Sequence, residues 1–148
     1  MRTYDLLIFQ RDLVPGVMKP TVQALALPGD GGLGCTGIQK LAQLVLTDLL
    51  NEQASSPYVE GGTNLIGAFA RGEVQSDLDV FQAFGFAAAR TTQTLQGREL
   101  DTDELDERLD EIVLDRVAIL PGYVQLFFHV TSLAGSSYQL QPTIQTLV

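Results

Sequence analysis

A change of hydrophobic period along the chain constrains its fold more than any other feature. In residues 77–96 apolar side chains recur at helical spacing, whereas residues 123–133 alternate between apolar and polar. A period of 3.6 residues is typical of a helix, and a period of two is typical of a strand with one buried face. Helices in the middle of the chain followed by strands at its end predict an α+β fold.

The two longer predicted helices have recognisable ends. Residues 38–52 follow Thr36, a suitable N-cap, and Leu46 and Leu50 widen the apolar face of this helix. Such a broad face predicts packing against a partner, or burial between the long helix and the sheet. The long helix, 77–96, is predicted to begin at a capping box and to end before Gly97. Its expected core stripe is Phe81, Phe84, Ala88 and Leu95.

The last third of the chain predicts a three-stranded antiparallel meander. The strands are 112–120, 123–133 and 138–148, and turn residues such as Pro121 and Gly122 separate them. The core face of the middle strand is formed by Val124, Leu126, Phe128 and Val130.

The chain of 148 residues is expected to form a single domain. We divide it into three parts, 1–36, 37–97 and 98–148. The first holds short strands at 4–9 and 22–27 and a glycine-rich connection, the second is helical, and the third combines an acidic hinge with the antiparallel sheet.

The charge of the chain limits its partners. A net charge of −9 opposes binding to a phosphate backbone, so we expect no nucleic-acid partner. No apolar run reaches the ~18 residues typical of a membrane span, so we expect no membrane partner. Nine of the eighteen acidic residues lie between Glu99 and Asp115, which predicts a solvated face or an interface for a basic partner.

One glycine motif resembles a cofactor site. Residues 32–37 match G-x-G-x-x-G between a predicted strand and a helix, as in dinucleotide-binding folds. Those folds continue with a second parallel strand, but residues 53–60 of this chain read as a loop. We therefore expect no cofactor, and we interpret the glycines as a connection.

Catalytic and metal-binding patterns are also weak. A calcium loop starting at Asp101 would place Asp106 where glycine is required and Ile112 where glutamate is required. The single histidine, His129, falls on the strand face opposite the core, and no nucleophile is predicted beside it. We therefore expect no catalytic and no metal-binding residues, and a protein that is not an enzyme.

Features of the last strand favour assembly. Because it contains Pro142, this strand is expected at the edge of the sheet, where it can accept a strand from another chain. The candidate interface residues lie on this strand, in the acidic hinge and on the helix 38–52: Tyr138, Leu140, Ile144, Val148, Glu107, Arg108, Leu46 and Leu50.

Two segments carry a resemblance to a known family. Residues 37–43, Gly-Ile-Gln-Lys-Leu-Ala-Gln, and 57–65, Pro-Tyr-Val-Glu-Gly-Gly-Thr-Asn-Leu, resemble the baseplate-wedge family of contractile phage tails. That family includes a baseplate subunit of type VI secretion systems. Its long helix, a segment like residues 106–109 and a terminal antiparallel sheet are similar as well. The Glu-Pro-Arg triplet of the family is not present, and residues 107–109 read Glu-Arg-Leu.

The resemblance implies a structural sheath initiator in the virion tail baseplate, assembled in the host cytoplasm. Such a subunit seeds the sheath by strand exchange and joins a helix bundle. Its partners would be the sheath protein, larger wedge proteins and tail tube or hub proteins, with six copies around the tube. A tail-terminator or neck subunit is the alternative. A nucleotide-binding or hydrolytic enzyme is less favoured.

Overall fold

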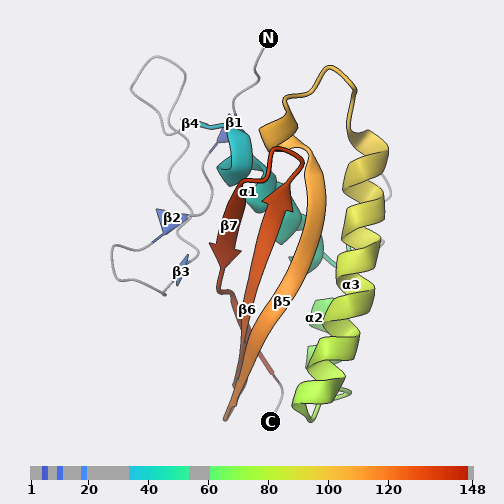
Figure 1. Ribbon diagram of the computed structural model, residues 1–148. Helices are drawn as coiled ribbons and strands as arrows, with labels where there is room; N and C mark the ends of the chain where they lie inside the picture. The colour runs from blue at the N-terminus through green and yellow to red at the C-terminus, as the bar shows by residue number, and fades with distance from the viewer. Residues whose placement is uncertain (1–4, 7–9, 12–17, 20–33, 54–60, 147–148) are drawn as a thin grey trace.

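The computed structural model of the protein describes residues 5–6, 10–11, 18–19, 34–53 and 61–146. In these residues, helices from the middle of the chain lie against an antiparallel sheet built from its C-terminal third (Figure 1). The predicted α+β class is therefore confirmed.

The C-terminal sheet has four strands rather than three. The central strand, β6, pairs with β5 along one side, and with β7 and β8 one after the other along its other side, always antiparallel. The bounds are β5 Leu109–Leu120, β6 Tyr123–Ser132, β7 Ser137–Leu140 and β8 Thr143–Gln145.

The prediction of one continuous last strand over 138–148 was wrong. The break between β7 and β8 falls at Gln141 and Pro142. Proline has no N–H to donate to a ladder, so the regular pairing stops there. The Pro142 carbonyl still accepts a hydrogen bond from Leu126 N at 3.0 Å, and this bond keeps the chain beside β6 until β8 begins.

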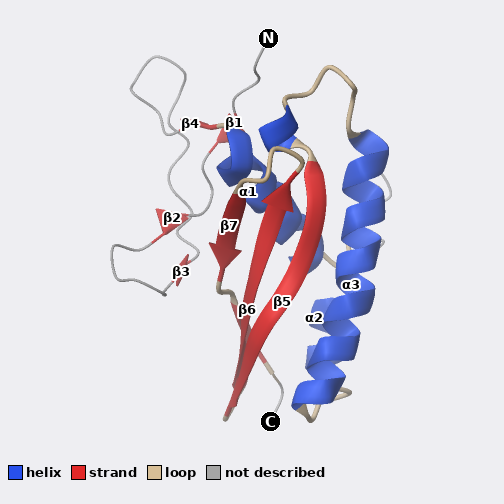
Figure 2. Cartoon of the chain, viewed as in Figure 1, coloured by secondary structure: helices blue, strands red, loops and turns tan. Residues whose placement is uncertain are grey.

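Three helices cover one face of this sheet. They are α1 (Gly37–Leu50), α2 (Leu65–Ala70) and α3 (Asp77–Arg98). In Figure 2, α1 crosses behind β6 and β7, and α3 runs along β5. The short helix α2 contacts α3 and β8. The described elements leave the opposite face of the sheet open.

The core lies between these helices and β6. The predicted alternation in β6 is confirmed, because Val124, Leu126, Phe128 and Val130 are all at most 2% exposed. The rings of Phe128 and Phe84 of α3 are 5.1 Å apart between centroids and are tilted by 54°. This tilted geometry is a favourable one for aromatic pairs, so it fixes α3 on the sheet.

The structure of α3 confirms one prediction and corrects two. The confirmed one concerns its N-terminal end, and the corrected ones concern its C-terminal end and its core stripe. The capping box is present: Asp79 N donates to Ser76 Oγ, and the Asp79 carboxylate accepts from Ser76 N. Gly97, however, lies inside the helix, which ends at Arg98 because Glu99 turns extended. Phe81 is 42% exposed, and Val80, at 0%, takes its expected place in the core stripe.

The first turn of α1 is capped from a distant segment. Thr36 occupies the N-cap position as predicted, but its side chain makes no capping hydrogen bond. Instead Glu107 Oε1 accepts from Gly37 N at 3.0 Å, and Glu107 Oε2 lies 3.0 Å from Lys40 Nζ. A carboxylate at a helix N-terminus also interacts favourably with the helix dipole. The acidic hinge is thereby tied to α1.

The last turn of α1 is held by the loop that follows it. Asp48 is only 8% exposed, and its carboxylate accepts hydrogen bonds from Gly62 N at 2.9 Å and from Thr91 Oγ1 at 2.7 Å. Thr63 Oγ1 donates to Leu49 O at 2.7 Å. The buried side chains of Asp48, Thr63 and Thr91 are therefore satisfied, and the loop joins α1 to α3.

The hinge between α3 and the sheet contains a single 3₁₀ turn, η1 (Leu105–Glu107). β5 begins at Leu109, three residues earlier than predicted. Leu109 N donates to Glu99 Oε1 at 2.6 Å, so the strand starts where the end of α3 holds it.

The N-terminal part forms two small antiparallel pairs. β1 (Asp5–Leu6) pairs with β4 (Gly34–Cys35), and β2 (Gln10–Arg11) pairs with β3 (Met18–Lys19). Of the predicted strand at 4–9, the structure describes residues 5–6, which form β1. The predicted strand at 22–27 lies outside the described residues.

Candidate functional site

β7 forms an open edge of the sheet. Within the described residues, no strand pairs with its outer side. Ser132 N donates to Ser136 O at 2.9 Å, and bonded pairs recur at every second residue of an antiparallel ladder. Tyr138 and Leu140 therefore bond to β6, while Gln139 turns its N–H and C=O away from the sheet.

The two edges of the sheet differ in charge and regularity. Residues 136–146, which include β7 and β8, contain no charged side chain. The opposite edge strand, β5, carries Asp110, Glu111, Asp115 and Arg116, and its register shifts at Asp110 and Asp115. Bulges and charges protect natural edge strands from pairing with other chains. Only the β7 edge is thus suited to accept a strand.

The predicted interface residues of the last strand differ in how far their side chains are buried. Leu140 and Ile144 are 1% and 5% exposed, so their side chains belong to the core of this chain. Tyr138 is half-buried and packs against that core. Val148 lies outside the described residues. What β7 offers to a partner is therefore its backbone rather than these side chains.

The predicted interface residues of α1 are turned inward. Leu46 is 2% exposed, and Leu50 packs against the core. Because α1 contacts β6 and β7 on one side and α2 and α3 on others, most of its broad apolar face is covered within the chain, although Leu44 stays exposed. The sequence predicted that the broad face of this helix either packs against a partner or is buried within the chain, and Leu46 is buried within the chain.

Glu107 and Arg108 are engaged inside the hinge. The Glu107 carboxylate caps α1, and the Arg108 guanidinium lies 3.8 Å from Glu99 and 3.9 Å from Asp101. The structure brings these predicted residues close to α1 and α3. Through these contacts Glu107 connects the hinge to the start of α1, and Arg108 connects it to Glu99 at the end of α3.

Three of the large exposed apolar residues in the described part of the chain lie on α3, and the sequence analysis missed them as a surface. Leu78, Phe81 and Phe86 are 66%, 42% and 81% exposed. Between Leu78 and Gly97, Arg90 is the only charged residue among the exposed positions of this helix. A signal was present, because the regular spacing of Val80, Phe84, Ala88, Thr91 and Leu95 leaves both phenylalanines off the buried stripe.

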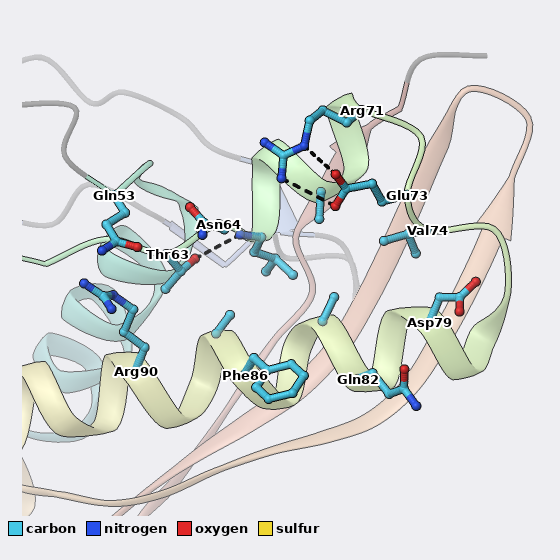
Figure 3. A pocket seen from close by; sticks show the side chains of 14 residues that line it. Gln53, Thr63, Asn64, Arg71, Glu73, Val74, Asp79, Gln82, Phe86 and Arg90 are labelled. Atoms are coloured by element: carbon cyan, nitrogen blue, oxygen red, sulfur yellow. Dashed lines mark hydrogen bonds and ion pairs between the residues drawn. The ribbon is translucent and has the colours of Figure 1, made fainter.

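A groove of about 580 Å³ runs between α2 and α3 (Figure 3). Its apolar lining includes Leu65, Ala68, Ala83 and Ala87, with Phe86 among the side chains of α3. Arg90 lies near Gln53 and Asn64 at one end, and Arg71, Glu73 and Asp79 lie toward the other, as Figure 3 shows.

The charges at that second end are largely matched. Arg71 Nε donates to Glu73 Oε1 at 2.7 Å, and this hydrogen bond lowers the pKa of Glu73 and raises that of Arg71. Asp79 accepts hydrogen bonds from Gln75 N and Ser76 N, which lower the pKa of its carboxyl group. Arg71 and Glu73 therefore form a neutral pair, and Asp79 keeps its negative charge at neutral pH.

The open face of the sheet carries the single histidine. His129 lies opposite the core set, as predicted, and its Nδ1 is 2.8 Å from Asp115 Oδ2. Beside it, Arg116 Cζ lies 4.0 Å from the ring centroid of Phe127. The sequence reading missed the Asp115 contact, because the register shift beside Asp115 is set only by the pairing of β5 with β6. In the described part of the chain, no hydroxyl or thiol is hydrogen-bonded to this imidazole.

Metal and cofactor chemistry find little support in the described residues. No group of three or more His, Cys, Asp or Glu side chains among them is arranged to hold a metal ion. Of the glycine motif at 32–37, the described part forms β4 and the first residue of α1. Among the helices that the structure describes, none is both long and apolar enough to span a bilayer.

The chain matches no protein-family model, no curated protein and no solved structure.

Proposed function

We propose that this protein is a structural, non-enzymatic subunit of a contractile-tail baseplate that initiates the sheath. In this role it stands in the baseplate wedge of the virion, in six copies around the tube. Its partners are the sheath protein, larger wedge proteins and tail tube or hub proteins. Strand exchange recruits the sheath, and helix contacts hold the subunit in the wedge.

The observation that carries the proposal is the edge of β7. It presents outward backbone groups at Gln139, has no charged residue, and belongs to a sheet whose other edge is bulged and charged. An edge of this kind accepts an extended segment through main-chain hydrogen bonds. Addition of a sheath strand there would continue the sheet beyond β7.

A second observation supports the helix contacts. Leu78, Phe81 and Phe86 of α3 are exposed, and Phe86 lines the groove between α2 and α3, where exposed apolar surface suits contact with another protein. α3 is thus the helix that faces a partner, in place of α1.

The test uses a proline substitution at the edge. Gln139→Pro removes one outward N–H and leaves the bonds of Tyr138 and Leu140 to β6 in place. The control is Gln139→Thr, which keeps the N–H and suits a strand. Each variant is co-expressed with the sheath protein, and recruitment is measured by pull-down and electron microscopy. Deletion of β8 would be a poorer test, because Ile144 is buried in the core.

We expect Gln139→Pro to stay folded and to lose sheath recruitment, and Gln139→Thr to recruit normally. Normal recruitment by a folded Gln139→Pro variant would refute strand addition at β7. Light scattering of the isolated protein provides a further check: a monomer agrees with the wedge role, whereas a closed ring indicates a tail-terminator or neck subunit.

A further inference from the structure

We propose that the groove between α2 and α3 binds an amphipathic helix of a partner protein, and that this helix presents an acidic residue to Arg90. The inference deepens the helix-contact part of the proposed function and rests on it for the partner being a wedge protein. The groove is separate from the β7 edge, so the two are tested apart.

Part of the apolar surface of the groove is exposed to solvent. Phe86 is 81% exposed, and the groove is also lined by Ala83 and Ala87 of α3 and by Leu65 and Ala68 of α2. An aromatic side chain left this far in water gains from burial against an apolar partner. The shape therefore suits a row of apolar side chains inserted between the two helices.

The charge at one end of the groove selects the partner. Arg90 Nε donates to Gly62 O at 3.0 Å, which leaves the two Nη groups of the guanidinium for other acceptors. Among the described residues, no carboxylate forms an ion pair with Arg90. In a chain with a net charge of −9, this is a local positive site, and a carboxylate of the partner is complementary to it.

The other end of the groove sets the direction of the bound helix. Asp79 and Arg90 are eleven positions apart on α3, a distance of about 16 Å at the helical rise of about 1.5 Å per residue. A helix with an acidic residue near its N-terminus and a basic residue about three turns later matches both charges. Such a helix runs antiparallel to α3, and acids near its start and bases near its end also favour its own dipole.

A helix fits this surface better than a strand does. The groove lies between two helices, α2 and α3, and none of the described strands lines it, so it offers no strand edge to extend. Ala83 and Ala87 of α3 and Ala68 of α2, which line the groove, are small, and a second helix packs closely where side chains at the contact are small.

The experiment measures binding of a designed helix to the full chain by fluorescence anisotropy. The probe is a labelled, stapled peptide of about 15 residues with leucines on one face, glutamate at its N-terminal end and lysine at its C-terminal end. The groove variant is Phe86→Ser. The matched control is Phe81→Ser, which changes an exposed phenylalanine of the same helix outside the groove. We expect Phe86→Ser to weaken binding by more than about tenfold and Phe81→Ser by less than about twofold.

Charge reversal tests the role of Arg90. Arg90→Glu should weaken binding of the glutamate peptide, and a peptide with lysine at that position should regain most of the affinity. Circular dichroism confirms that each variant is folded. The proposal is overturned by non-saturable binding, by equal losses at Phe86 and Phe81, or by no regain with the lysine peptide.

Two further measurements are needed. The first distinguishes a partner helix from a second copy of the chain in the groove, and the second distinguishes the groove proposal from strand addition at β7. A dimer in sedimentation that Phe86→Ser abolishes would place a second copy in the groove and would overturn a partner helix. Gln139→Pro should leave peptide binding unchanged. Loss of sheath recruitment with intact peptide binding therefore supports β7 independently, and failure of the peptide to bind leaves the β7 result standing.

Discussion

Thr91 of α3 donates a hydrogen bond from Oγ1 to Asp48 Oδ2 of α1 at 2.7 Å, although the two residues are 43 positions apart in the chain. Both side chains are buried, with exposed fractions of 0% and 8%. The other carboxylate oxygen of Asp48 accepts from Gly62 N. One buried carboxylate thus joins two helices and the loop between them.

Removing this carboxylate should destabilise the fold strongly. Asp48→Ala leaves Gly62 N and the Thr91 hydroxyl without their buried acceptor, and we expect a loss of about 3 kcal/mol in the free energy of unfolding. Thr91→Val should cost about 1–2 kcal/mol. Urea unfolding measures both, and the double variant should lose less than the sum, because the two residues share one interaction. Asp77→Ala, at an exposed position of α3, is the control. An additive double variant would contradict the coupling.

Two glycines with positive φ should respond differently to alanine. Gly62 has φ +81°, and a Cβ there would lie 2.8 Å from Glu52 O and 2.9 Å from Asn51 O. Gly72 has φ +69°, with nothing within 4 Å of its Cβ position. Gly72→Ala should cost about 1–2 kcal/mol from the backbone conformation alone. Gly62→Ala adds the clash with backbone, so we expect a loss above about 3 kcal/mol. Thermal unfolding compares the two variants. Equal losses of stability would mean that the loop at Gly62 shifts at little cost and relieves the clash.

Glu107 should stabilise the start of α1 from the acidic hinge. Glu107→Ala removes the acceptor of Gly37 N and the partner of Lys40, and we expect a loss of about 1–2 kcal/mol. Glu107→Gln retains an oxygen for Gly37 N and loses only the charge, so its cost should be smaller. Hydrogen exchange of the first turn of α1 reports the effect locally. Unchanged exchange in Glu107→Ala would show that Thr36 or water replaces the cap.

The capping carboxylate of Asp79 should contribute to the dependence of stability on pH. Hydrogen bonds from Gln75 N and Ser76 lower its pKa in the folded chain. A carboxyl group with a lowered folded pKa stabilises the fold at pH values above its unfolded pKa, and this contribution disappears as the pH falls through the folded pKa. The difference in stability between wild type and Asp79→Asn should therefore be present at neutral pH and shrink in acid. A difference that stays constant as the pH falls would contradict this linkage.

Several local features of the fold were predictable from short stretches of sequence. One is the alternation of β6 from Val124 to Val130, and another is the capping box of Ser76 and Asp79. Each involves residues that are only a few positions apart in the chain. The period of side chains is set by the geometry of the backbone element, so the pattern is visible before the chain folds. The order of helices followed by strands came from the same signals.

Which apolar side chains stay exposed depends on long-range packing. Leu46 and Phe86 are both large apolar residues on helices, yet Leu46 is 2% exposed and Phe86 is 81% exposed. The difference arises because the face of α1 that carries Leu46 packs inside the chain, whereas Phe86 lies on a face of α3 that the described residues leave uncovered. Helical spacing shows that a face is apolar, and it does not show what covers that face.

The sequence by itself determined the α+β class, the positions of the main helices and the core face of β6, because these follow from local periodicity and end signals. Only the tertiary structure decided that the last segment divides at Pro142 into β7 and β8, that Glu107 caps α1, and that the edge at Gln139 and the groove beside Phe86 are open to other chains. These features depend on contacts between residues far apart in the chain, and such contacts exist only after the sheet has paired and the helices have docked on it.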